Sequence, residues 1–83
     1  MAHCYILRSQ STGRYYVGST NDLARRISEH ARGHTPSTRG RGPWILVHQE
    51  PLPTLQEARK RELEIKRWKS AKLIAQLIAE SKG

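Results

Sequence analysis

The chain has 83 residues, of which 36% are hydrophobic, and it contains no phenylalanine and a single cysteine. This length predicts one domain over residues 1–83, and the lack of any apolar run near the ~20 residues of a membrane span excludes an integral membrane protein. Fifteen lysines and arginines against seven acids give a net charge of +8, which indicates an anionic partner, most simply nucleic acid.

Two short apolar runs at the N-terminus predict an antiparallel hairpin. Residues 3–8 and 14–18 are rich in aromatic and branched side chains, and a polar connection that ends at Gly13 joins them. Side chains alternate between the two faces of a strand, so Tyr15 and Tyr16 point in opposite directions. One of them is expected to pack in the core and the other to be available for function.

The next predicted element is a helix over residues 22–32. Capping residue types at positions 19–22 precede it, and Gly33 follows it. Arg26 and His30 lie four positions apart beside its short apolar stripe. One interpretation places both on the rim of the core with their stems packed, and the other places them in a cleft.

A basic loop is expected over residues 33–43, which are rich in glycine and proline and contain no acid. Arginines lie at its edge and inside it: Arg32, Arg39 and Arg41. The apolar run at 44–48 predicts a third strand with His48 at its end, and prolines at 51 and 53 break the chain after it.

Two helices complete the predicted order β-β-α-β-α-α, an α+β fold. They cover residues 54–69, after a Thr-x-x-Glu capping box, and residues 71–80. In the first of them, Arg61 or Glu62 interrupts the apolar stripe. A carboxylate there must be paired, hydrogen-bonded or metal-bound, and a rim salt bridge to a nearby arginine is the structural alternative to a site.

Cysteine use and the N-terminus bear on the compartment. Because Cys4 is the single cysteine, no internal disulfide can form, and it is expected to be a small buried side chain. No Cys/His cluster has the spacing of a zinc site. The apolar stretch at residues 4–7 is too short for a signal peptide. An anionic membrane surface is the competing polyanion, but no helix combines a lysine-rich face with a bulky aromatic one. These features predict a cytoplasmic protein without membrane partners.

Five residues in order carry a resemblance to a known family: Tyr5, Tyr16, Arg26, His30 and Glu62. With this order and spacing, the chain resembles the GIY-YIG endonuclease superfamily, in particular its small stand-alone bacterial branch. Positions 16–18 read Tyr-Val-Gly for the second half of the motif. Positions 3–5 read His-Cys-Tyr where the family pattern has Gly-Ile-Tyr, so only the tyrosine of the first half is kept.

The resemblance implies a three-stranded antiparallel sheet flanked by helices, and metal-dependent hydrolysis of DNA phosphodiester bonds. It makes Glu62 the protein ligand of Mg²⁺ or Mn²⁺, and Arg26 the clamp on the scissile phosphate. It makes Tyr16 the general base or the group that positions the attacking water. Tyr5 and His30 would complete the hydrogen-bond network around these groups.

The leading hypothesis is therefore an endonuclease acting on branched, single-stranded or damaged DNA, in repair or recombination. It requires that a phenol, a guanidinium and a carboxylate meet in one basic hollow. The residues expected to bind the nucleic acid are Arg25, Arg32, Arg39 and Arg41. The alternatives are a non-catalytic nucleic-acid-binding module with a decayed site, and a basic adaptor for a protein partner.

Overall fold

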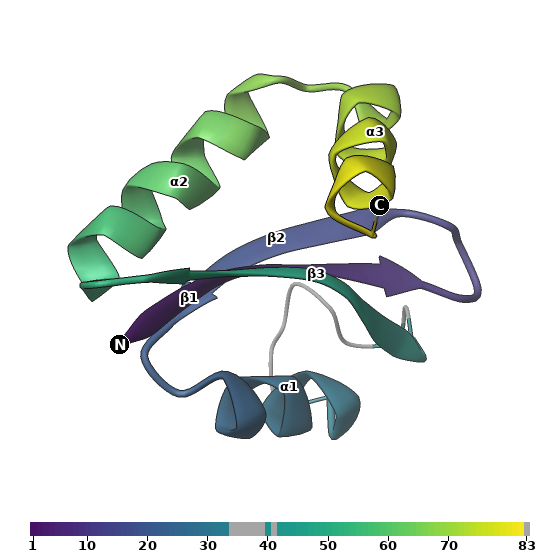
Figure 1. The fold of residues 1–83 in the computed structure, drawn as a ribbon. Helices are drawn as coiled ribbons and strands as arrows, with labels where there is room; N and C mark the ends of the chain where they lie inside the picture. The colour runs from purple at the N-terminus through teal and green to yellow at the C-terminus, as the bar shows by residue number, and fades with distance from the viewer. Residues whose placement is uncertain (34–39, 41, 83) are drawn as a thin grey trace.

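A three-stranded antiparallel sheet lies at the centre of the fold in the computed structural model, which describes residues 1–33, 40 and 42–82 (Figure 1). The strands are β1 (Ala2–Ser9), β2 (Tyr15–Thr20) and β3 (Trp44–Leu52), and their order in the sheet is β2-β1-β3. The helices are α1 (Leu23–Ala31), α2 (Leu55–Arg67) and α3 (Ala71–Lys82). The predicted α+β class and the element order β-β-α-β-α-α are confirmed.

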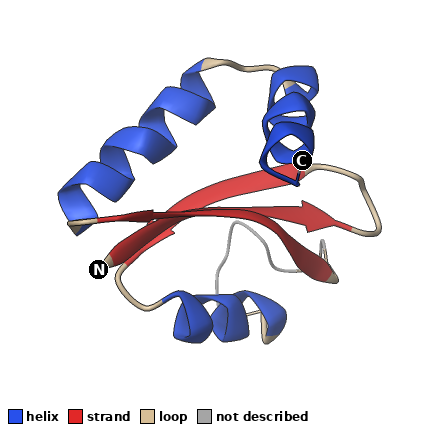
Figure 2. Ribbon diagram, viewed as in Figure 1, coloured by secondary structure: helices blue, strands red, loops and turns tan. Residues whose placement is uncertain are grey.

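The helices form layers on both faces of the sheet. Helix α1 covers one face, and α2 and α3 cover the other (Figures 1 and 2). No helix in the described ranges is long and apolar enough to cross a membrane. Because α1 is separated from α2 by the sheet, residues on these two helices can act together only around a strand edge.

The main core lies between the sheet and the α2–α3 layer. Cys4 and Ile6 of β1 and Ile65 of α2 are fully buried there, and Ile78 of α3 packs with them. Tyr15 packs against this cluster. The alternation of side chains along β2 then turns Tyr16 toward the α1 face. The sequence predicts the opposite directions of the two tyrosines, and the structure shows that Tyr15 is the one in the core.

Strand β3 is longer than the sequence suggests. The prediction that it ends at His48 was wrong, because pairing with β1 continues through His3↔Pro51 to Ala2↔Leu52. β3 is an edge strand, and an edge position tolerates a proline since its missing N–H need not serve a second neighbour. His48 is therefore in the middle of a strand, and it is 8% exposed.

The helix starts follow the capping residues in the sequence. Asp22 is the N-cap of α1 rather than part of its first turn, and its carboxylate accepts a hydrogen bond from the Arg25 amide at 3.2 Å. Thr54 caps α2 in the same way, and Ser70 accepts from the amide of Leu73 at the start of α3. These local signals are why the sequence places the helix starts within a residue or two.

Candidate active site

Two tyrosines and a histidine form a cluster on the α1 face of the sheet, here called the tyrosine cluster (Tyr5, Tyr16 and His30). The hydroxyl of Tyr5 lies 2.9 Å from Nε2 of His30, and both residues are buried, with exposures of 1% and 3%. The ring centroids of Tyr16 and His30 are 4.8 Å apart in an edge-to-face arrangement. Strands β1 and β2 supply the tyrosines and helix α1 the histidine.

The register of the hairpin creates this cluster. Tyr5 pairs with Gly18 across the strands, so Tyr16, two residues earlier on β2, is its diagonal neighbour on the same face. A Cβ at Gly18 would lie 2.5 Å from both Cζ and the hydroxyl oxygen of Tyr5. Position 18 therefore requires a glycine, because the phenol of Tyr5 lies directly against the backbone of β2. The sequence marks Gly18 as part of a motif but does not reveal this reason.

Arg26 joins the cluster from helix α1. Its Nη1 donates to Oε1 of Glu29 at 3.0 Å, and this hydrogen bond is the largest cause of a raised pKa for Arg26. Burial raises the pKa of Tyr5 to about 12, although the neighbouring Arg26 guanidinium acts in the opposite direction. At neutral pH the site thus holds a neutral Tyr5 phenol beside a permanent positive charge.

The imidazole of His30 is neutral in this environment. Burial lowers its pKa, and the positive charge of Arg26 lowers it further, while Glu29 acts weakly in the opposite direction. Its position also distinguishes the two interpretations of Arg26 and His30, which placed them either on the rim of the core or in a cleft. His30 is enclosed between the helix and the sheet, whereas the side chain of Arg26 is 34% exposed and reaches solvent.

Glu62 approaches the same end of β2 from the opposite face of the sheet. Ser19 donates to its Oε1 at 2.5 Å, and Lys66 donates to its Oε2 at 2.5 Å. Ser19 directly follows Gly18, against which Tyr5 lies, and the negative charge of Glu62 contributes to the raised pKa of Tyr5. The structure brings Tyr5, Tyr16, Arg26 and His30 together on the α1 face, and it places Glu62 on the other side of the edge strand. The phenol, guanidinium and carboxylate that were expected in one hollow are therefore arranged around the edge of β2, because α2 packs on the face opposite α1.

The carboxylate of Glu62 is the group that could hold a metal. Its side chain is 20% exposed, and a hard oxygen donor of this kind suits Mg²⁺, which often takes one or two carboxylates and fills its other positions with waters and substrate phosphates. In the described ranges no group of three or more His, Cys, Asp or Glu residues has a metal-binding arrangement. The residues therefore fit a sparsely ligated cation, provided that Lys66 releases one oxygen.

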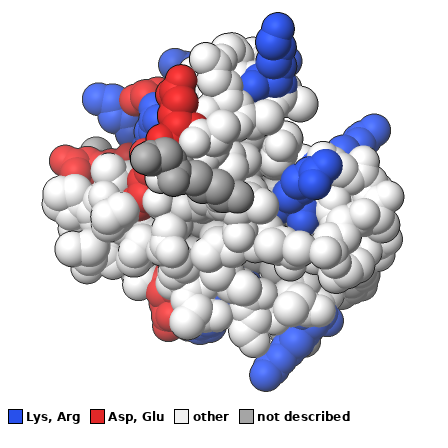
Figure 3. Space-filling model, turned by 45° about the vertical axis from the view of Figure 1, so that its right-hand side comes forward, with Lys and Arg blue, Asp and Glu red and all other residues white. Residues whose placement is uncertain are grey.

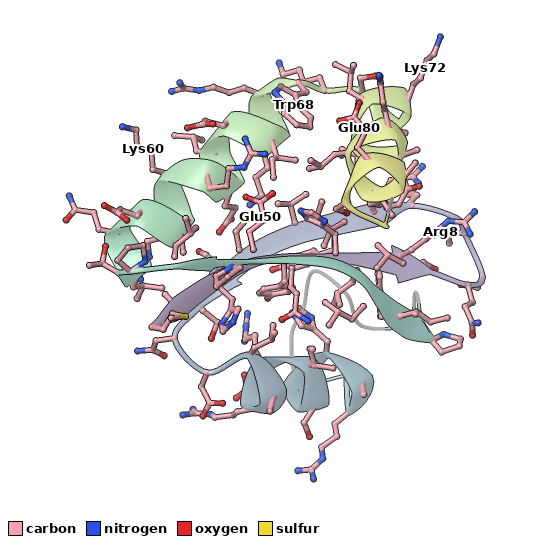
Figure 4. The ribbon with its side chains drawn as sticks, in the orientation of Figure 1. Arg8, Glu50, Lys60, Trp68, Lys72 and Glu80 are labelled. Atoms are coloured by element: carbon pink, nitrogen blue, oxygen red, sulfur yellow. The ribbon has the colours of Figure 1, made fainter. Side chains whose placement is uncertain are left out.

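The predicted rim salt bridge also exists, but its partners differ. Glu62 pairs with Lys66 rather than with an arginine. Arg61, the other polar residue in the gap of the stripe, binds Glu50 of β3 through Nε at 2.9 Å, and it also pairs with Glu64. Glu50 projects from the sheet toward α2 (Figure 4).

Sequence reasoning missed the network around Glu50. Nε2 of His48 lies 2.7 Å from Glu50, and Nδ1 of His48 lies 3.0 Å from the hydroxyl of Ser81 on α3. Burial raises the pKa of Glu50, but the hydrogen bonds from Arg61 and His48 together hold it below its usual value. The sequence does contain a signal for this network, because His48 and Glu50 are two positions apart and side chains at that spacing share one face of a strand. The prediction that the strand ends at His48 left Glu50 outside it.

Two of the four arginines expected to bind nucleic acid are described. The side chain of Arg25 is 75% exposed and pairs with Glu29, and Arg32 is the C-cap residue at the end of α1. Arg39 and Arg41 lie outside the described residues. On the face shown in Figure 3, basic side chains occupy several separate positions, and acidic side chains gather with some of them in one area.

Cys4 plays no part in the site. It is fully buried in the core on the α2 face, as the sequence predicts for a small apolar side chain, and burial raises its pKa to about 12. A thiol with so high a pKa carries almost no thiolate at neutral pH and is a poor nucleophile.

The fold and the site define an α+β domain in which a tyrosine cluster, an arginine and a helical glutamate lie around one edge of an antiparallel sheet. Comparison with known proteins is consistent with it. Residues 1–75 match the family described as the GIY-YIG catalytic domain. The chain therefore belongs to the GIY-YIG family, a family of nucleases.

The similar proteins are small and share most of this domain. A UPF0213 protein of Halobacterium salinarum is 43% identical over 67 residues, covering 80% of this chain and 86% of the relative. A UPF0213 protein of Xanthomonas axonopodis is 37% identical over 79 residues, covering 94% of this chain and 76% of the relative. The solution NMR structure of a UPF0213 protein from Bacillus halodurans aligns with a TM-score of 0.63 at 39% identity, covering 100% of this chain and 88% of that one.

Proposed function

We propose that this chain is a divalent-metal-dependent endonuclease that hydrolyses DNA phosphodiester bonds, with a role in repair or recombination. The observation that supports it best is the arrangement around Gly18. Tyr5 lies against the backbone of β2 on one side, and Ser19, the next residue, holds Glu62 on the other. A single strand edge thus carries both the phenol side and the carboxylate side of the motif.

In the proposed reaction, a water oxygen attacks phosphorus and loses a proton, the bond to the leaving sugar oxygen breaks, and that oxygen takes up a proton from solvent. Arg26 binds the non-bridging oxygens and stabilises their growing negative charge. Tyr16, the more accessible tyrosine of the cluster, orients the water or takes its proton. Glu62 holds Mg²⁺ or Mn²⁺, which when bound would neutralise charge on the phosphate.

Tyr5 and His30 serve as positioning residues in this proposal. Tyr5 has a pKa of about 12, so it remains a neutral hydrogen-bond donor at working pH. His30 is neutral because of burial, and its Nε2 at 2.9 Å can accept the phenolic proton of Tyr5. The hydrogen bond between Tyr5 and His30 fixes the two rings against which Tyr16 packs.

The test is cleavage of flap, single-stranded and plain duplex DNA by purified protein with Mg²⁺ or Mn²⁺. We expect Glu62→Gln and Arg26→Ala to lower the rate at least about 100-fold, the scale of losing one charge-stabilising group. Glu64→Gln is the matched control, because it removes the same charge from an exposed position on the same helix. Absence of cleavage of every substrate with either metal would exclude the enzymatic function.

A non-catalytic nucleic-acid-binding module is the second candidate. It is favoured by the partners of Glu62, because Ser19 donates to one of its carboxylate oxygens and Lys66 to the other. This function predicts that Glu62→Gln leaves DNA affinity unchanged and that no variant alters any cleavage signal. Binding titrations of the same variants in EDTA distinguish the two functions.

A further inference from the structure

We infer that a hollow beside the tyrosine cluster binds one unpaired nucleobase of the substrate strand, with the indole of Trp44 as its stacking surface. This inference rests on the proposed function and names the substrate class as DNA that is unpaired next to the scissile phosphate. The hollow, here called the Trp44 hollow, has a volume of about 420 Å³. It lies between the C-terminal end of α1 and the start of β3.

The Trp44 hollow is continuous with the candidate active site. His30 belongs both to its lining and to the tyrosine cluster. The ring centroids of Trp44 and Tyr16 are 6.3 Å apart at an interplanar angle of 68°, so Trp44 extends the series of rings that begins at Tyr5. A nucleotide whose phosphate lies beside Tyr16 would therefore have a neighbouring base close to the indole.

The lining suits a nucleobase. Gly33, Gly40 and Gly42 contribute backbone without side chains, which leaves room for a flat ring, and Trp44 is partly exposed. Arg32 supplies a positive charge at the wall for the strand's phosphates. An aromatic surface with an adjacent cation is the combination that binds single-stranded nucleic acid, because every base has a π-face.

The same lining selects against an intact duplex. A base within a duplex is already paired and stacked, so it must leave the helix before it can stack on a protein side chain. Flaps, single strands and damaged sites present unpaired bases without that cost. The Trp44 hollow would therefore favour such substrates over an intact duplex.

The first test measures binding in EDTA, so that no cleavage occurs. In Trp68→Phe protein Trp44 is the remaining tryptophan, and its fluorescence is followed on titration with a 12-nucleotide oligo-dT and with a strand of the same length made of abasic nucleotides. We expect oligo-dT to quench Trp44 and to bind about tenfold more tightly than the abasic strand, the scale of one base–aromatic stack. Equal affinity for both strands, or binding without quenching, would overturn the inference.

The second test compares cleavage of single-stranded and duplex DNA by Trp44→Ala, Trp44→Phe and Ile45→Ala. We expect Trp44→Ala to lower kcat/KM on the single strand about 5- to 100-fold and Trp44→Phe to retain most of it. Ile45, the next residue on β3 and 45% exposed, is the control and should behave like the unmodified protein. Equal losses for Trp44→Ala and Trp44→Phe would count against stacking.

Failure of the inference and failure of the proposed function give different results. If the protein cleaves DNA but does not distinguish oligo-dT from the abasic strand, the base site is wrong and the nuclease function stands. If oligo-dT quenches Trp44 and no substrate is cleaved, the base site stands and the nuclease function is wrong.

Discussion

The absence of a side chain at Gly18 determines how closely the ring of Tyr5 approaches β2. Gly18→Ala would place a Cβ 2.5 Å from the Tyr5 ring, so the ring or the strand must shift. Overpacking of this kind costs about 1–3 kcal/mol, which exceeds the ~0.4–1 kcal/mol gained from a less flexible unfolded chain. We therefore expect a net loss of unfolding free energy, measured by urea denaturation.

The clash itself can be separated from other effects of the new methyl group. In a Tyr5→Leu background the ring is gone, so adding Gly18→Ala should cost less than half of what it costs in the unmodified chain. An equal cost in both backgrounds would show that Tyr5 is not the neighbour that requires a glycine at position 18.

His30 gives stability a defined pH dependence. Its folded pKa is lowered below the ordinary value of about 6.5, so the unfolded chain binds a proton that the folded chain does not. The stabilising contribution is therefore present above pH 6.5 and is lost as the pH falls through the folded pKa. We expect the unfolding free energy to decrease below pH 6.5 by up to ~1.4 kcal/mol per pH unit.

The measurement is urea denaturation at intervals between pH 7 and pH 5.5, for the unmodified protein and for His30→Gln. This window lies above the titration of Glu29 and Glu50, whose pKa values are both lowered. His30→Gln should flatten the dependence. If the unfolding free energy of the variant depends on pH as steeply as that of the unmodified protein, a group other than His30 takes up the proton on unfolding.

At the scale of elements, helix α2 is oriented by the ion pair between Arg61 and Glu50 of β3. The two side chains are 26% and 23% exposed, and Arg61 also lies over the ring of Trp68 at 5.6 Å. Because α2 also carries Glu62, this pair fixes which side of the helix faces β2. It belongs to the α2 face of the sheet, away from the tyrosine cluster.

We expect a double-mutant cycle of Glu50→Gln and Arg61→Met to give a coupling energy of about 1 kcal/mol, as for a partly screened ion pair. Unfolding free energies from urea denaturation at low salt supply the four corners of the cycle. The coupling should shrink in 1 M salt. Additive effects of the two substitutions would mean that α2 is held by its apolar contacts alone.

At the scale of the whole molecule, the charge of +8 predicts strong salt dependence of DNA binding. Each neutralised phosphate contributes about −0.7 to the log–log slope for single strands and −0.9 for duplexes. If Arg25 and Arg32 bind phosphates, Arg25→Gln and Arg32→Gln should each reduce the slope by about that amount.

Lys72→Gln is the matched control for these arginines. Lys72 lies on α3, on the face of the sheet opposite α1 (Figures 1 and 4), and the substitution removes the same unit of charge. Affinity should change little in this variant when it is measured by fluorescence anisotropy at several salt concentrations. Equal slope changes for all three variants would indicate diffuse attraction instead of a site along α1.

The sequence by itself determined the elements and the residue types of the site. Strand alternation and capping residues act over a few positions, so the hairpin, the helix starts and the opposite directions of Tyr15 and Tyr16 followed from local chemistry. The five motif residues and the burial of Cys4 were also identified from the chain alone.

Tertiary structure decided what depends on contacts between distant segments. Whether Pro51 ends a strand depends on β3 being at the sheet edge, and the environment of His48 depends on Ser81 and Glu50. The closeness of Tyr5 to Gly18 comes from strand register. The contact of Glu62 with Ser19 of β2 comes from helix α2, which packs on the face of the sheet opposite α1. No spacing within one element carries this information, because it arises only when separate elements pack together.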